Sequence, residues 1–233
     1  MITARKETYG LSGNQLKILA LIAMTCDHVG KLLLPELTVL QMIGRLAFPI
    51  FAYMIAEGCV HTKSRTQYLL KMLSLAAVCQ LVYFFAVGSL YQCVLVTFSL
   101  SIGLMYLLDY AQKRGSPLAW LLAGVGLAGV LGVVYLLPIC LPDTDFCIDF
   151  GLWGVLLPVC VRLGKTMPEK LLLMTADLLL LSLSMGGVQW YALLAVPLLA
   201  LYNGRRGKKR LKHLFYIYYP LHLCFIYLIG LVV

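Results

Sequence analysis

Long apolar runs, separated by short polar segments, dominate this chain. A helix of about 20 residues crosses the hydrocarbon core of a bilayer, and a window of that length predicts nine spans. They lie at residues 15–34, 39–60, 67–87, 91–110, 118–137, 150–163, 170–185, 188–203 and 212–232. The runs are continuous and lack the alternation of a transmembrane β-barrel. The pattern therefore predicts an all-α, polytopic bundle of membrane-spanning helices.

Composition supports a membrane protein with a single domain. The chain is 61% hydrophobic and 12% charged, whereas soluble domains are about 25% charged and about 45–50% apolar. No linker long enough to separate a second domain and no internal repeat is visible, so we expect one transmembrane domain over residues 1–233. The first apolar run is too long for the core of a cleavable signal peptide, so we expect it to remain as a signal anchor.

The positive charge is distributed asymmetrically about the predicted spans. With the N-terminus in the cytoplasm, 17 of the 19 Lys and Arg residues fall in segments on the inner side. Because cytoplasmic loops of membrane proteins are rich in Lys and Arg, this placement explains the net charge of +9 without a nucleic-acid partner. We expect a cytoplasmic N-terminus, and membrane lipids among the partners.

The eight cysteines do not predict a metal site. No CxxC pair or Cys/His cluster has the spacing of zinc ligands. Cys140 and Cys147 lie in the acidic outer loop 138–149, where they could form a disulfide in an oxidising compartment or remain two free thiols. The sequence leaves this choice open.

Ionisable side chains within the spans are the candidates for chemistry, because an Asp at the centre of a membrane helix costs about 3 kcal/mol. They are Asp27, His28, Arg45, Glu57, Asp177 and His222. The helical rise of about 1.5 Å per residue puts Asp27, His28 and Arg45 in one layer toward the outside. It puts Lys17 and Glu57 in a second layer toward the cytoplasm. Asp177 has no identified partner.

Asp27 and His28 are the predicted centre of the site. Adjacent helical residues point about 100° apart, so we expect Asp27 to pair with Arg45 on the next helix while His28 faces a cavity as a general base. Gly44 would permit close approach of the helices, and Pro49 would kink the chain beside Arg45. The alternative is a polar network that only ties helices together.

Two further groups of residues could line the site. Pro220 breaks the last span, and Tyr218, Tyr219 and His222 beside it could form the polar wall of a substrate cavity; an aromatic belt is the alternative. At the cytoplasmic side, Glu57 could pair with Lys17 or cap the basic loop that follows. In that loop Lys63 and Arg65 could meet a polyanionic cofactor or simply obey the positive-inside rule.

Five stretches, in order, resemble the TraX family, which is named for the pilin acetylase of conjugal transfer. They are LKILALIAMTCDHVGKLLLP, IGRLAFPIFAYMIAEG with its basic continuation TKSRTQYLLK, FGLWGVLLP, QWYALLAVPLLALYNGRRG and FYIYYPLHL. The chain is also similar to a wider group of transmembrane acyltransferases, in which a basic residue, ten intervening residues and a histidine mark the first catalytic helix. Lys17 and His28 have that spacing.

The resemblance implies a membrane acyltransferase that takes an acetyl group from acetyl-CoA. His28 would be the general base or the acyl relay, with Asp27 and Arg45 beside it. Lys17, Glu57, Lys63 and Arg65 are the predicted cofactor-binding residues. The resemblance also implies a multi-pass protein of a bacterial plasma membrane.

The acceptor and two rival functions stay open. A protein N-terminus, a glycan or a lipid headgroup would each fit as acceptor, and the oligomeric state, a homo-oligomer included, is not specified. A proton-coupled transporter would need the same buried polar residues, although internal repeats and matching broken helices are not visible. A non-catalytic assembly protein with a structural polar network is the third hypothesis.

Overall fold

The fold was taken from a computed structural model, which describes residues 10–207, 217–219, 221, 222, 225, 226, 228 and 229. Within these residues the regular structure is helical, with two isolated parallel bridges, Leu11–Tyr202 and Gln92–Ile148. The predicted all-α class is confirmed. Pro220, to which the sequence analysis assigned a helix break, lies outside the described residues.

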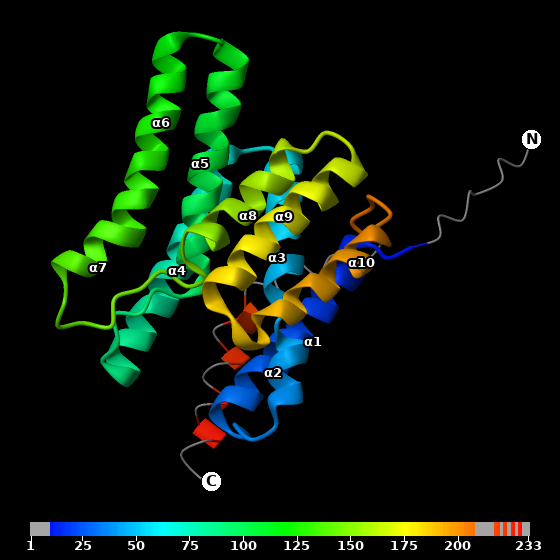
Figure 1. The fold of residues 1–233 in the computed structure, drawn as a ribbon, viewed down its shortest axis with the longest axis vertical. Helices are drawn as coiled ribbons and strands as arrows, with labels where there is room; N and C mark the ends of the chain where they lie inside the picture. The colour runs from blue at the N-terminus through cyan, green and yellow to red at the C-terminus, as the bar shows by residue number, and fades with distance from the viewer. Residues whose placement is uncertain (1–9, 208–216, 220, 223–224, 227, 230–233) are drawn as a thin grey trace, which may run out of the picture. The chain divides into compact units, whose positions relative to one another are not determined.

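The helices follow one another with short connections (Figure 1). They are α1 (Gly13–Leu32), α2 (Thr38–Gly44), α3 (Ala47–His61), α4 (Arg65–Val87), α5 (Val94–Arg114), α6 (Pro117–Leu131), the π-helix η1 (Gly132–Leu136), α7 (Leu137–Cys140), α8 (Gly151–Leu163), α9 (Met167–Met185), the 3₁₀ helix η2 (Gly187–Leu194) and α10 (Ala195–Ala200).

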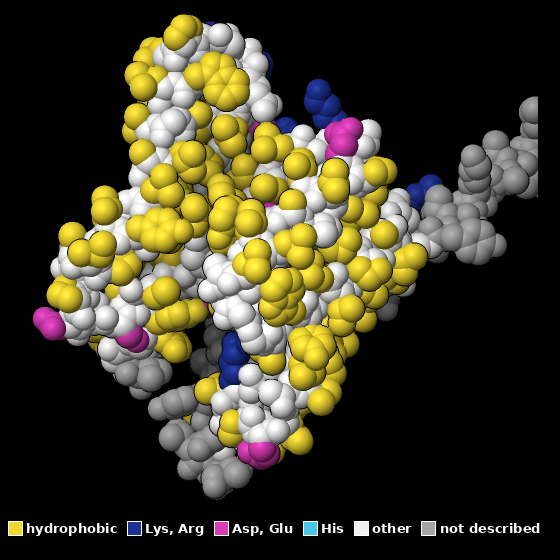
Figure 2. All heavy atoms as spheres, viewed as in Figure 1, with side chains coloured by type: hydrophobic (Ala, Val, Ile, Leu, Met, Phe, Trp, Pro, Cys, Tyr) yellow, Lys and Arg dark blue, Asp and Glu magenta, His cyan; other side chains and the backbone are white. Residues whose placement is uncertain are grey.

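Among the described residues, four helical segments are long and apolar enough to cross a membrane: Thr38–His61, Arg65–Phe85, Val94–Arg114 and Pro117–Cys140. Two further apolar helices, Gly151–Leu163 and Gly187–Ala200, are shorter. Yellow apolar side chains cover α6 and α7 on the face drawn in Figure 2, as expected of helices that face lipid. The count of nine spans and the cytoplasmic N-terminus remain predictions.

The chain divides into two compact units. Unit 1 comprises residues 1–51 and 188–233, and unit 2 comprises residues 52–187. The predicted single domain over residues 1–233 remains a prediction.

In unit 1, α1 and α2 pack closely against each other. Ser12 caps α1 and forms a reciprocal capping box with Gln15, which satisfies amide groups that the first helical turn leaves unpaired. A Cβ on Gly44 would overlap Asp27, and one on Gly30 would lie 2.9 Å from Cβ of Leu40. The two glycines therefore allow the contact, as predicted for Gly44.

The predicted kink beside Arg45 is present as a break between two helices. α2 ends at Gly44, Arg45 and Leu46 form a turn, and α3 begins at Ala47. Pro49 consequently lies in the first turn of α3, where its missing N–H removes no hydrogen bond. The break frees Arg45 from a continuous helix.

In unit 2, α5 is the central helix and packs against α4, α6 and α8, while α8 packs against α9. The Ser101 hydroxyl on α5 lies 2.9 Å from the Thr97 carbonyl and 2.7 Å from the Val155 carbonyl on α8. A small hydroxyl that bonds to backbone carbonyls lets two helices pack closely. α5 therefore fixes the positions of the residues on its neighbours.

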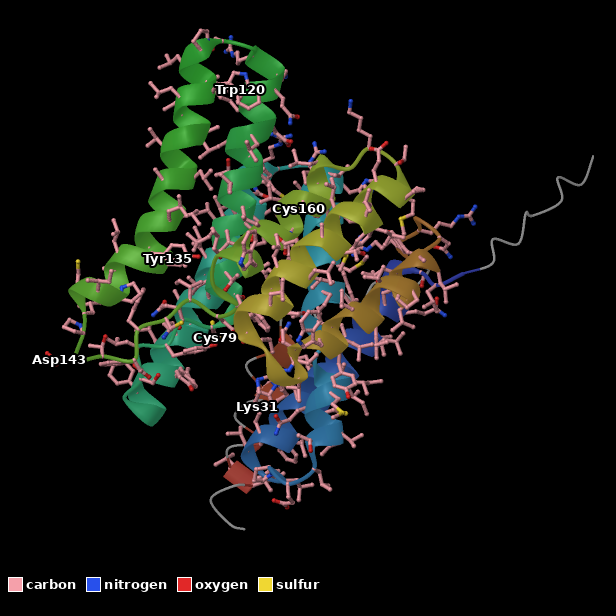
Figure 3. All side chains as sticks on the ribbon, in the orientation of Figure 1. Lys31, Cys79, Trp120, Tyr135, Asp143 and Cys160 are labelled. Atoms are coloured by element: carbon pink, nitrogen blue, oxygen red, sulfur yellow. The ribbon has the colours of Figure 1, made fainter. Side chains whose placement is uncertain are left out.

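The loop between α7 and α8 packs against the segment that follows α4. The Ser89 hydroxyl and the Leu90 amide both donate to Asp145 and hold the pKa of that carboxyl below its usual range. Asp143 lies toward the tip of the same loop (Figure 3). Cys140 and Cys147 are both exposed free thiols, so the free-thiol alternative is the one present.

Replacement of Gly44 by Ala should destabilise the protein by about 1–3 kcal/mol through overpacking, because the new Cβ would lie 2.7 Å from Cα of Asp27. Thermal unfolding in detergent measures this change. The control is Gly103→Ala in α5, where a Cβ meets nothing within 4 Å and Ala should stabilise the helix by up to about 1 kcal/mol. An unchanged Tm for Gly44→Ala would contradict the close helix contact.

Candidate functional site

The Asp27 carboxylate on α1 forms ion pairs with two basic side chains. Its Oδ1 lies 3.1 Å from Nη2 of Arg45, and its Oδ2 lies 2.6 Å from Nζ of Lys31 (Figure 3). The Asp27 and Arg45 side chains are 13% and 10% exposed, whereas that of Lys31 is 45% exposed. The predicted pairing of Asp27 with Arg45 is therefore present. Lys31 was missed as a partner, although its i,i+4 spacing from Asp27 is a recognisable signal.

Arg45 also contacts a buried amide that the sequence analysis missed. Nη1 of Arg45 donates to Oε1 of Gln189 over 3.4 Å, and Gln189 in η2 is 2% exposed. Nε of Arg45 is buried and has no hydrogen-bond partner within the described part of the chain. Only ionisable side chains within the apolar runs were considered as candidates for chemistry. A neutral Gln is also costly to bury, so Gln189 could have been recognised by the same argument.

His28 and His222 form a pair with defined tautomers. Nδ1 of His28 lies 2.8 Å from the Met24 carbonyl, and Nδ1 of His222 lies 3.0 Å from the Tyr218 carbonyl. A carbonyl can only accept, so in the neutral ring each Nδ1 carries the hydrogen. Nε2 of His222 can then accept from Nδ1 of His28 across 3.4 Å. This assignment leaves Nε2 of His28 as the basic nitrogen.

Two tyrosines hold the His222 ring. The Tyr218 ring is stacked on it at 5.3 Å with an interplanar angle of 9°, and the Tyr219 ring meets it edge-on at 5.6 Å. Thr25 donates to the Leu21 carbonyl over 2.9 Å, so the Tyr218 hydroxyl, 2.7 Å from the Thr25 hydroxyl, is the donor of that bond. The structure thus brings Tyr219 and His222 together with His28. The substrate cavity that these residues were predicted to line remains a prediction.

Glu57 on α3 belongs to unit 2 and has a partner that the sequence did not suggest. Its Oε1 accepts from Nζ of Lys170 over 2.6 Å, and its Oε2 lies 3.5 Å from Nε2 of His61. Lys170 comes from α9, which is more than a hundred residues away in the chain, and the sequence gives no indication of such a pairing. The Glu57–Lys17 alternative remains a prediction.

The predicted basic cofactor residues have different surroundings. Lys17 is half-buried on α1 in unit 1 and is repelled by the positive charge of Arg206. Lys63 is exposed in the loop between α3 and α4 in unit 2. Arg65, the first residue of α4, donates from Nη2 to Oδ2 of Asp109 over 2.8 Å. Each lies at the end of a helix or in a loop, where an anion can approach.

Asp177, unexplained by the sequence, is a buried carboxyl on α9. It is 3% exposed, and its Oδ1 lies 3.8 Å from Sγ of Cys160 on α8 (Figure 3). Its Oδ2 has no hydrogen-bond partner within the described residues. In that same part of the chain, no three His, Cys, Asp or Glu residues gather in a way that could hold a metal ion.

The two partners of Asp27 should differ strongly in their contribution to stability. Arg45→Gln leaves the Asp27 charge without its buried partner and should cost about 3–5 kcal/mol. Lys31→Gln removes the same charge from an exposed side chain and should cost below about 1 kcal/mol. Denaturant unfolding of both variants in the same detergent measures the difference. Equal losses would show that burial does not govern the Asp27 interactions.

Comparison with known proteins identifies the family. The family model described as TraX protein matches residues 12–230. The probable fimbrial assembly protein FimC, serogroup H1, of Dichelobacter nodosus is 25% identical over 240 residues, which cover 91% of this chain and 93% of that protein. An uncharacterized protein of Rickettsia prowazekii (strain Madrid E) is 58% identical over 38 residues, which cover only 16% of this chain and 15% of that protein. No solved structure matches.

Because the family model covers nearly the whole chain, and with it both units, the chain belongs to the TraX family.

Proposed function

We propose that the protein is an acyltransferase of the bacterial cell membrane that moves an acetyl group from cytosolic acetyl-CoA to an amine or hydroxyl acceptor. The observation that carries this proposal is the His28–His222 pair, in which both Nδ1 atoms lie against backbone carbonyls. A neutral imidazole with a defined basic nitrogen is suited to general base catalysis. The association of the TraX family with pilin acetylation agrees with this chemistry.

In the simplest reaction, Nε2 of His28 takes the proton of the acceptor as its nitrogen or oxygen attacks the thioester carbonyl. The carbon–sulfur bond then breaks, and the imidazolium returns that proton to the departing CoA thiolate. The products are the acetylated acceptor and CoA. In the relay variant, Nε2 itself attacks the thioester carbonyl, the carbon–sulfur bond breaks and CoA leaves as the thiolate. The acceptor then takes the acetyl group as the nitrogen–carbon bond to Nε2 breaks, and the proton that the acceptor loses passes to the thiolate.

In this proposal Arg45 stabilises negative charge on the attacked carbonyl oxygen. Arg45 and Lys31 both pair with Asp27, which precedes His28 in the chain. Within the described residues the buried Nε of Arg45 is an unused donor, and a fixed donor near developing charge is a large term in acyl transfer. In this proposal Asp27 holds the Arg45 guanidinium in place.

The donor would approach from the cytoplasmic side. In unit 2, Lys63 and Arg65 would meet the phosphate groups of CoA, and the Glu57–Lys170 pair would fix the end of α3 that precedes them. Lys17, in unit 1, stays a predicted cofactor-binding residue. For the acceptor we favour a protein, because one relative is named as a fimbrial assembly protein. A glycan and a lipid headgroup are the other acceptors to test.

A proton-coupled transporter is the second candidate, and Asp177 is the observation that favours it. A buried carboxyl with an unpaired oxygen is typical of proton pathways in membrane proteins. Solute flux driven by a proton gradient in proteoliposomes without CoA, lost on Asp177→Asn, would support this function over acyl transfer.

The test of acyl transfer is binding and turnover with acetyl-CoA. The purified protein should bind CoA and gain thermal stability from it, because a ligand that binds only the folded state stabilises it. His28→Ala should retain CoA binding and lose acetyl transfer by a factor of roughly 100 or more. Cys26→Ala, two positions away on α1, is the control that should keep its activity. Absence of CoA binding to the wild-type protein would reject the proposal.

His222 should act by positioning His28. In His222→Phe the aromatic stacking on Tyr218 can persist and Nδ1 of His28 keeps the Met24 carbonyl, but its second acceptor, Nε2 of His222, is lost. A hydrogen bond of about 1 kcal/mol corresponds to a fall in kcat of roughly five- to tenfold, with the KM for acetyl-CoA unchanged. Steady-state kinetics in detergent measures both values. A raised KM with unchanged kcat would place His222 in donor binding instead.

A further inference from the structure

Asp109, near the end of α5 in unit 2, binds two arginines from different helices. Its Oδ2 lies 2.8 Å from Nη2 of Arg65 on α4, and its Oδ1 lies 2.9 Å from Nη2 of Arg162 on α8. Asp109 is 10% exposed, whereas Arg65 and Arg162 are 52% and 34% exposed. The carboxylate therefore lies beneath two guanidinium groups that reach the surface.

Each guanidinium keeps donors that Asp109 does not use. Both ion pairs are made through a single Nη2 atom, whereas a guanidinium has five N–H donors. Nε of Arg162 is buried without a hydrogen-bond partner in the described part of unit 2. The Tyr106 ring, 5.2 Å from the Arg65 guanidinium carbon, fixes the plane of that group. The donors that a ligand can reach are therefore the Nη groups that Asp109 does not use.

The surroundings of these residues are basic. Lys63, Lys113 and Arg114 lie at the same helix ends, are exposed, and make no ion pair within the described residues. Two arginines on one carboxylate leave a net positive charge, so the cluster attracts an anion.

A purely structural ion triad is the alternative interpretation. It would join α4, α5 and α8, which already pack together in unit 2. It does not account for the exposure of both arginine side chains, which are 52% and 34% exposed. Paired guanidinium groups with free edges match the oxygens of a phosphate group. Phosphate binding accounts for this exposure.

We propose that Arg65, Tyr106, Asp109 and Arg162, here called the Asp109 cluster, bind the 3′-phosphate of CoA. The 3′-phosphate is the only phosphate monoester of CoA and carries nearly two negative charges at neutral pH, which suits two guanidinium groups. Arg162 and Arg65 bind the phosphate oxygens, and Asp109 positions both arginines. This inference rests on the proposed function, because it names the part of the donor that the basic end of unit 2 holds.

The experiment compares CoA with dephospho-CoA, which lacks only the 3′-phosphate, by calorimetry on the full chain in nanodiscs of phosphatidylcholine. Wild-type protein should bind CoA roughly tenfold or more tightly than dephospho-CoA, since hydrogen bonds to charged groups are strong. Arg162→Gln should weaken CoA to the level of dephospho-CoA and leave dephospho-CoA unchanged. Arg114→Gln, the matched loss of an arginine beside Tyr110, should keep the full preference for CoA.

The outcomes separate this inference from the proposed function. Equal binding of CoA and dephospho-CoA by the wild-type protein would overturn the inference alone, and this measurement needs no variant to fold. An equal loss for both ligands in Arg162→Gln would also overturn it, since the arginine would then be structural. If neither ligand binds, the proposed function fails with it.

A lipid phosphate is the other source of the same chemistry. Nanodiscs that contain phosphatidic acid, a lipid phosphate monoester, should leave the preference for CoA intact if the Asp109 cluster serves the donor. The opposite outcome has two parts: the preference for CoA is lost in these nanodiscs, and Arg162→Gln recovers the CoA binding that phosphatidic acid suppressed. This outcome would assign the Asp109 cluster to a lipid headgroup and overturn the inference.

Discussion

An Asp inside an apolar helix must be paired, and the pairing of Asp27 with Arg45 constrains the rest of unit 1. Both side chains are nearly buried, so neither charge can rely on water. The pair requires α1 and α2 to approach closely, which Gly44 permits, and it requires the helix to stop so that Arg45 can turn toward α1. The close packing of α1 on α2 at Gly44 is tied to this one contact, and His28 lies next to it because it follows Asp27 on α1.

The sequence predicted the features that depend on local rules. Helix type, the Asp27–Arg45 pair and the close approach at Gly44 follow from periodicity, side-chain directions and the cost of buried charge. The break at Arg45 was expected from Pro49 but lies upstream of it, because a proline fits best in a first turn. These predictions need only neighbouring segments of the chain.

Contacts between distant segments could not be predicted in the same way. Glu57 binds Lys170, Arg45 contacts Gln189, and Asp109 holds Arg162, across separations of 113, 144 and 53 residues. A hydrophobicity profile gives the depth of each residue but not which helices are neighbours. Asp109 and Arg162 also lie at the ends of the predicted spans 91–110 and 150–163, where a charged side chain can reach water.

The carbonyls of Met24 and Tyr218 each lie one helical turn before the histidine that they contact. In many enzymes a carboxylate fixes the tautomer of a catalytic histidine, and its own protonation then limits the pH range of activity. Here the peptide backbone does so, and a peptide carbonyl does not titrate. The basic nitrogen of His28 therefore depends on the helical conformation around Met24. If the helix unwound there, the His28 ring would lose the carbonyl that fixes its tautomer, and the other ring nitrogen could become the reactive atom without any change in charge.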